Sequence, residues 1–184
     1  MASIVSVEQL KGLASGSTPN TISIPAGQTL HAPGHVIQAI DSGAKNTSVT
    51  VQSTTFTNTD MINVAITPKF ATSKIYVVVT QNIQIWNTSN YSTGRWRILR
   101  NIAGGSYSAV MEDSDSSNGN IFAYDYGGSG INVYSPVTYQ FLDSPNTTSQ
   151  IIYKTQIAQG SNGGNRITSD VENPGRMTLL EIAQ

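Results

Sequence analysis

The sequence contains no cysteine. Disulfide bonds, thiolate metal sites and cysteine nucleophiles are therefore excluded, and stability must come from apolar burial and strand pairing. Charged residues are also scarce: they make up 11% of the 184 residues, against about a quarter in an average soluble domain. With 10 basic and 11 acidic side chains the formal net charge is −1. This balance gives no electrostatic footprint for nucleic acid or an anionic membrane, so we expect neither as a partner.

Long apolar runs and catalytic groupings are missing too. No stretch approaches the ~20 apolar residues of a membrane span, so membrane insertion is not expected. His31 and His35 are four residues apart, but Pro33 and Gly34 between them break any helix that would place both on one face. We find no Ser–His–Asp set and no pair of carboxylates at a spacing typical of hydrolases. The sequence therefore predicts no catalytic residue, no cofactor and no enzyme activity.

One acidic segment, EDSDSSNGN, has part of a calcium-loop pattern. Asp113 and Asp115 stand at alternate positions, but Gly119 comes one place late and Tyr124 replaces the expected bidentate glutamate. We favour a solvated acidic loop and predict no metal site, and leave a structural calcium at Asp113 and Asp115 as the alternative.

What the sequence does contain is period-2 alternation interrupted by short turns. In the segment 74–86, Ile75, Val77 and Val79 share one face, and the polar residues and Trp86 lie mainly on the other. Ten such strands are expected, with a weaker one near 165–171: 34–41, 47–57, 61–67, 74–86, 94–102, 106–111, 119–126, 130–142, 149–158 and 175–183. Face-to-face pairing of two sheets buries so many one-sided strands, so we predict an all-β antiparallel sandwich or jelly roll over residues 34–184.

Residues 1–33 differ from the rest. Three prolines and three glycines surround a short alternating stretch, which is typical of an extended arm that orders on a partner surface. A disordered leader is the alternative. The arm's apolar residues have no core of their own, so we expect them to attach the chain to other proteins. They are Val7, Leu10, Leu13, Ile22 and Ile24.

Two of the expected strands are apolar on both faces. Val78 lies opposite in phase to Val77 and Val79, and Leu180 and Ile182 are out of phase with Met177 and Leu179. A central strand covered by a loop would explain this. We favour a subunit interface formed by Val78, Leu180 and Ile182 in a homotrimer.

A tyrosine-rich hairpin is the candidate ligand site. Tyr124, Asp125 and Tyr126 precede a glycine-rich turn, and the loop QGSNGGN adds Asn162 and Asn165. Aromatic rings beside carboxylate and amide groups are typical of sugar sites, although cross-strand tyrosine packing explains the pattern equally simply.

Four segments resemble a known family: APGHVIQAID (32–41), AITPKFATSKIYVVV (65–79), YQFLDSPNTTSQIIYKTQI (139–157) and MTLLEIA (177–183). They are similar to the jelly-roll domain of small tail-fibre-like structural proteins of tailed bacteriophages, notably aquatic ones. The resemblance implies a virion protein that acts as a tail-fibre or spike knob and recognises the host surface, with host surface polysaccharide as the candidate ligand. A capsid decoration or cement protein that stabilises the head is the alternative.

Counting strand crossings gives an expectation for the loops. If every strand crosses the sandwich, the loops near 42–46, 103–105, 127–129 and 159–164 lie opposite the end where the first strand begins. The loops near 88–93, 112–118 and 143–148 then lie at the end where it begins, and the opposite end carries the sugar site.

Overall fold

A computed structural model describes Ile24 and residues 26–88, 91–112, 121–124, 130–160, 164–167 and 174–184; for 58–60, 91, 121–124 and 164–167 it describes the backbone alone. The chain divides into two units, Met1–His31 and Ala32–Gln184. Of the predicted arm residues, Ile24 is described and is 46% exposed, while Val7, Leu10, Leu13 and Ile22 lie outside the described residues. The attachment role of this arm stays a prediction.

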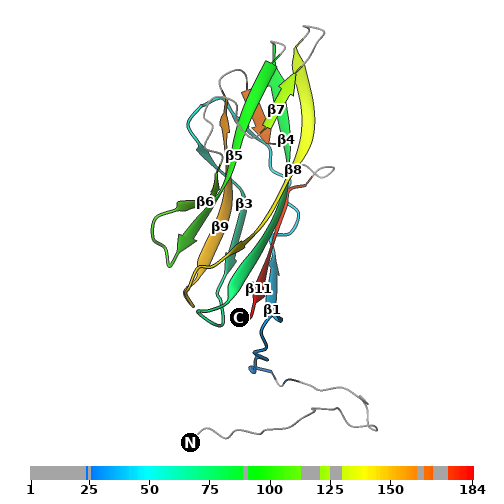
Figure 1. Ribbon diagram of the computed structural model, residues 1–184. Helices are drawn as coiled ribbons and strands as arrows, with labels where there is room; N and C mark the ends of the chain where they lie inside the picture. Colours follow the sequence, from blue (N-terminus) through cyan, green and yellow to red (C-terminus); the bar gives the residue numbers. More distant parts are fainter. Residues whose placement is uncertain are drawn as a thin grey trace, which may run out of the picture. The chain divides into compact units, whose positions relative to one another are not determined.

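Residues of the second unit form two antiparallel sheets (Figure 1). Sheet 1 contains β1 (Val36–Asp41), β2 (Val49–Val51), β4 (Lys74–Asn87), β8 (Ile131–Asp143), β10 (Gly164–Ile167) and β11 (Arg176–Ile182). Sheet 2 contains β3 (Thr57–Ile66), β5 (Tyr91–Ile102), β6 (Ser108–Glu112), β7 (Ile121–Tyr124) and β9 (Ile151–Gln159). Within the described ranges no helix is long and apolar enough to cross a membrane.

The short strands join in pairs to make full crossings of the sandwich. β11 pairs with the first half of β4 and β10 with its second half, and β1 and β2 line up beside them in the same way. β6 and β7 likewise pair with successive parts of β5. Sheet 1 therefore has the order β1/β2, β10/β11, β4, β8, and sheet 2 has β3, β9, β5, β6/β7. This is the eight-strand double Greek key of a jelly roll, so the predicted fold class is confirmed.

β8 is an outer strand of sheet 1. It pairs with β4 along its whole length, and among the described residues it pairs with no second strand. Pro136 lies in its middle, opposite Asn82. A proline is tolerated there because an edge strand leaves one row of N–H groups outside the ladder.

The core lies between the sheets and follows from the alternation. Trp96 and Tyr153 are its largest fully buried side chains, and the inward residues of β4 and β9 surround them. The Trp96 indole stacks on Tyr139 with ring centroids 5.2 Å apart. Its Nε1–H donates to Gln81 Oε1 at 2.9 Å, so the buried polar groups of both side chains are paired.

The strand pattern was predicted well, with one error that matters. The predicted strand 47–57 is wrong as a single element, because only Val49–Val51 pairs within it and β3 begins at Thr57. We call the end where β1 and β4 begin the base end and the opposite end the far end. β1 and β2 together make one crossing, so β4 ends at the far end, and the turn after Asn87 lies there rather than at the base.

The expected loop positions are corrected accordingly. The turn at 103–105 lies at the base end, because β5 ends there beside the start of β9, so its predicted position is wrong. β6 and β7 also share one crossing, and this second miscount cancels the first. The turns after β7 and β9 therefore start at the far end and the 144–150 connection lies at the base end, as predicted.

Candidate interaction surface

The outer face of sheet 2 is covered by the chain's own loops. The guanidinium groups of Arg95 and Arg97 lie 4.6 and 4.0 Å from the centre of the Phe56 ring, and Lys154 Nζ lies 3.9 Å from that of Tyr107. Arg97 also forms a 3.0 Å ion pair with Glu112. Each contact packs a cation on an aromatic face in a partly desolvated setting. The described side chains of this face therefore leave little apolar surface for a partner beyond the 39% exposed Tyr107 ring.

The outer face of sheet 1 is open and aliphatic toward the base end. Five outward side chains of β1, β11, β4 and β8 make up what we call the aliphatic patch: Val36, Val78, Leu142, Leu180 and Ile182. Val36 and Leu142 are 44% and 49% exposed, and the other three are half-buried. The structure thus brings together the three residues predicted for a subunit interface. The homotrimer itself stays a prediction.

A row of polar contacts crosses the same face next to the aliphatic patch. Thr178 Oγ1 donates to Asp41 Oδ2 at 2.8 Å, and Tyr76 OH donates to Gln140 at 2.5 Å. The Thr178 hydroxyl has the largest effect and lowers the pKa of Asp41 below its ordinary value. Desolvation opposes it, and the Gly43 N–H and Arg176 add smaller lowering effects. Asp41 therefore remains ionised at the rim of the patch.

Aromatic side chains lie beyond this row, toward the far end. Trp86 of β4 is 49% exposed and Tyr134 of β8 is 55% exposed. Gln84 pairs with Tyr134 and Trp86 with Asn132 in the strand register, which puts all four on the outer face. Gln84 Nε2 donates to Asn132 Oδ1 at 2.6 Å. We call these four residues the aromatic patch. The sequence analysis placed Trp86 on the polar side of its strand but missed Tyr134, whose outward phase in β8 was the available signal.

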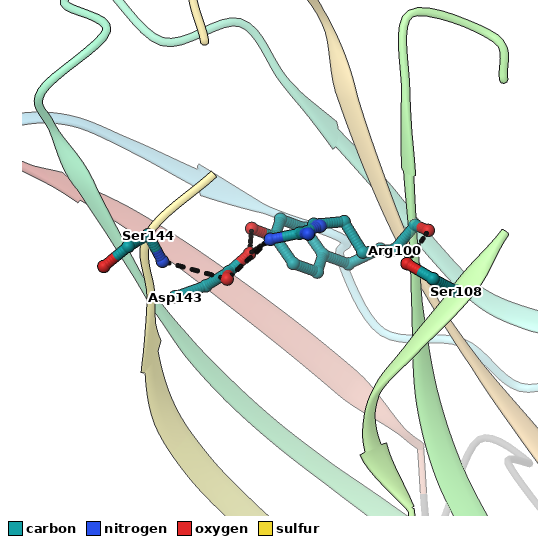
Figure 2. Close-up of polar contacts among 5 residues, drawn as sticks. Arg100, Ser108, Asp143 and Ser144 are labelled. Carbon is teal, nitrogen blue, oxygen red and sulfur yellow. Dashed lines mark hydrogen bonds and ion pairs between the residues drawn. The ribbon is translucent and has the colours of Figure 1, made fainter. Parts of the chain in front are cut away.

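An ionic network closes the base end between the two sheets. Arg100 Nη1 donates to both carboxylate oxygens of Asp143, at 2.7 and 2.8 Å, and Ser144 N donates to Oδ1 (Figure 2). Tyr153 OH donates to Oδ2 at 2.6 Å. Burial and the neighbouring Asp143 carboxylate raise the pKa of Tyr153 far above its ordinary value. The bonds from Arg100 and Tyr153 tie the end of β8 to sheet 2. Asp143 accepts four hydrogen bonds in total, so its carboxylate is fully occupied within the fold.

A second carboxylate at this end holds the connection between β3 and β4. Glu181 is fully buried, and its Oε1 accepts the backbone N–H groups of Lys69 and Phe70 at 2.7 and 3.2 Å. Its Oε2 accepts Gln38 Nε2 at 2.6 Å. Three of the four segments that carry the family resemblance therefore meet at one side chain.

The predicted sugar residues are only partly described. Asp125, Tyr126 and Asn162 lie outside the described residues. Tyr124 pairs with Tyr91 at the end of sheet 2, and Asn165 pairs with Ile85 in sheet 1. The sugar site at these residues stays a prediction.

Metal-binding side chains do not gather anywhere in the described part of the chain: no group of three His, Asp or Glu residues lies close enough to hold an ion. The candidate calcium residues Asp113 and Asp115 lie outside that part.

Comparison with known proteins finds similarity in fold alone. No family model matches the sequence, and no curated protein matches it significantly. One similar solved structure is the Eiger TNF of S. frugiperda, which is 10% identical with a TM-score of 0.44 over 82% of this chain and 95% of that one. Another is the Gt strain of infectious bursal disease virus, 9% identical with a TM-score of 0.38 over 89% of this chain and 42% of the viral one. The D431N mutant VP2 protein of that virus, in T=1 particles, is 12% identical with a TM-score of 0.34, over 94% of this chain and 40% of the viral one.

Proposed function

We propose that this chain is a non-enzymatic structural protein of a tailed-bacteriophage virion, and that it forms a tail-fibre or spike knob for host-surface recognition. The proposal rests on a difference between the two outer sheet faces, which are covered to different extents. Loops cover sheet 2, whereas sheet 1 leaves the aliphatic patch open. An uncovered aliphatic sheet face fits a protein that works in an assembly.

The base-end carboxylates support a structural role as well. Asp143 and Glu181 are both engaged by several donors within the fold. Carboxylates used in this way stabilise strand connections rather than transfer protons. Together with the sequence resemblance to phage jelly-roll domains, they favour a scaffold that presents surfaces and loops.

Location and binding test the proposal together. Gold-labelled antibodies against the chain should mark tail fibres or spikes in electron micrographs, and purified chain should bind cells of the host and compete with phage adsorption. Labelling over the head without any cell binding would instead establish the capsid decoration alternative. Absence of the chain from purified particles would refute both.

The arm can be tested on the same particles. Deletion of residues 1–30 removes Val7, Leu10, Leu13, Ile22 and Ile24, and should leave a folded sandwich that no longer joins particles. Circular dichroism confirms the fold, and immunoblotting of purified virions measures incorporation. Incorporation at the level of the full chain would show that the arm is not the anchor.

A further inference from the structure

We propose that the aromatic patch is a binding platform for a pyranose ring of a surface polysaccharide, with Trp86 and Tyr134 as stacking surfaces and the Gln84–Asn132 amide pair as hydrogen-bonding partner. This inference rests on the proposed role in host recognition, and it names the site and the ligand class for that role.

The strand register creates the platform. Trp86 and Tyr134 stand diagonally on the adjacent strands β4 and β8, two residues out of direct opposition. Diagonal neighbours on one sheet face are about 7–8 Å apart, within reach of large aromatic side chains. Both rings can therefore contact one sugar chain that runs across the two strands.

The exposure of Trp86 is unusual within this chain. The sequence has two tryptophans, and Trp96 is fully buried while Trp86 is 49% exposed. Tyrosine and tryptophan combine a large rigid contact area with few rotatable bonds, so they contribute binding surface at a low entropic cost. Two such side chains on the same open face mark a place for contact with another molecule.

The amide pair gives the platform a fixed polar group. Gln84 is 5% exposed, and its Nε2 holds Asn132 Oδ1 at 2.6 Å. Asn132 is exposed, and no described residue accepts a hydrogen bond from its Nδ2. The bond from Gln84 thus positions an amide whose two N–H donors have no acceptor within the described part of the chain and can donate to a ligand.

The composition of the patch indicates the ligand class. The described outward side chains of this half of the face are uncharged: Asn82, Gln84, Trp86, Asn132, Tyr134 and Pro136. A sugar ring has a C–H face that packs on aromatic rings and hydroxyl groups that pair with amides, and such mixed sites are typical for small polar ligands. The aliphatic patch, by contrast, consists of aliphatic side chains with Gln140 as the neighbouring amide, and it suits a protein contact.

The array compares neutral with acidic polysaccharides and so determines whether the bound sugar is charged. Arg166 occupies the register position opposite Gln84 on β10. Neutral polysaccharides are the expected ligands, and acidic ones serve as the comparison.

The test uses the full chain on a printed array of neutral and acidic bacterial polysaccharides, followed by fluorescence titration with an oligosaccharide of the best binder. Trp86 should respond to ligand while the buried Trp96 does not, so the emission shift should vanish in Trp86→Ala. We expect Trp86→Ala to weaken binding at least about tenfold, which corresponds to roughly 1.4 kcal/mol, and Tyr134→Ala to weaken it several-fold. Tyr107→Ala, which removes a 39% exposed aromatic ring from the opposite face, should leave affinity within about twofold.

Each outcome decides something. No binding to any array polysaccharide, or binding that survives Trp86→Ala, overturns the inference. If particles carry the chain, and particles with the Trp86→Ala variant adsorb normally to cells, then the aromatic patch is not the receptor site. The proposed function still stands in that case. If Trp86-dependent sugar binding occurs but the chain is absent from particles, the site stands and the proposed function fails.

Discussion

Gly160 permits a close approach between the end of β9 and β5. Its N–H donates to Thr93 O at 2.8 Å, and a Cβ added there would lie 1.7 Å from Thr93 Oγ1 and 2.9 Å from Thr93 O. Gly160→Ala must therefore push β9 and β5 apart, and we expect it to lower the free energy of unfolding by about 1–3 kcal/mol. Urea denaturation measures this loss. When Gly160→Ala is made in the Thr93→Gly variant, the loss of stability should be much smaller than in the parent. An equal loss in the parent and in Thr93→Gly would show that the Thr93 contact is not the cause.

Glu181 organises the β3–β4 connection through charge-assisted hydrogen bonds. Glu181→Gln places an amide NH₂ among the N–H donors of Lys69, Phe70 and Gln38, so a buried donor must lose its partner. We expect a loss of about 1–3 kcal/mol in the free energy of unfolding, measured by urea denaturation.

Glu112→Gln is the matched control for that change. Glu112, whose side chain is 31% exposed, forms an ion pair with Arg97, whose side chain is 22% exposed. Such pairs contribute about 0–1 kcal/mol, so the control should remain close to the parent. Equal effects of the two substitutions would contradict the anchoring role of Glu181.

Tyr153 gives the fold a defined sensitivity to alkali. Burial and Asp143 raise its pKa in the folded chain, whereas the unfolded chain releases the proton near the ordinary value of about 10. The folded state therefore binds more protons above that pH, and stability present below about pH 10 falls as the pH rises further. Urea denaturation between about pH 9 and 11 should show a shallower decline for Tyr153→Phe than for the parent. Tyr134→Phe, at an exposed position, should keep the parent's slope.

At the scale of the strands, sequence periodicity was sufficient to predict most strands. It was insufficient to predict which short strands join to make one crossing of the sandwich. The alternation in β4, β8 and β9 is long, because each strand is paired on at least one side over nearly its full length. β2 has only three residues, too short for a period to show, and its pairing with β10 depends on contacts more than a hundred residues away in sequence. The loop assignment failed at 88–93 and 103–105 for this reason, and also at 42–46, which joins β1 and β2 within one crossing.

The same limit applies to the surface. The outward phase of Val78, Leu180 and Ile182 was readable because each lies in a strand with a clear inward set. That Trp86 and Tyr134 belong together was not readable, since it requires the register of β4 against β8. Likewise, no local pattern shows that Asp143 meets Arg100 and Tyr153, because their alignment is fixed only when the two sheets pack.

For the whole molecule, the aliphatic patch predicts self-association. We expect sedimentation equilibrium at micromolar concentration to give a trimer of a 19.6 kDa chain. Leu180→Asp puts a charge next to Val78 and Ile182. Burial of that charge in an interface would be costly, so the variant should shift to monomers. Thr138→Asp, on the same face but outside the patch, is the control. A parent protein that sediments as a monomer would refute the trimer.

The edge position of β8 affects whether an assembly of this chain could keep adding copies. A long exposed strand edge can recruit further copies of itself without limit, which produces filaments and insoluble aggregates. Pro136 removes an N–H group from the middle of β8 and projects its ring there, so a second copy cannot continue the ladder across that point. Pro136 thus opposes open-ended strand addition at this edge of β8.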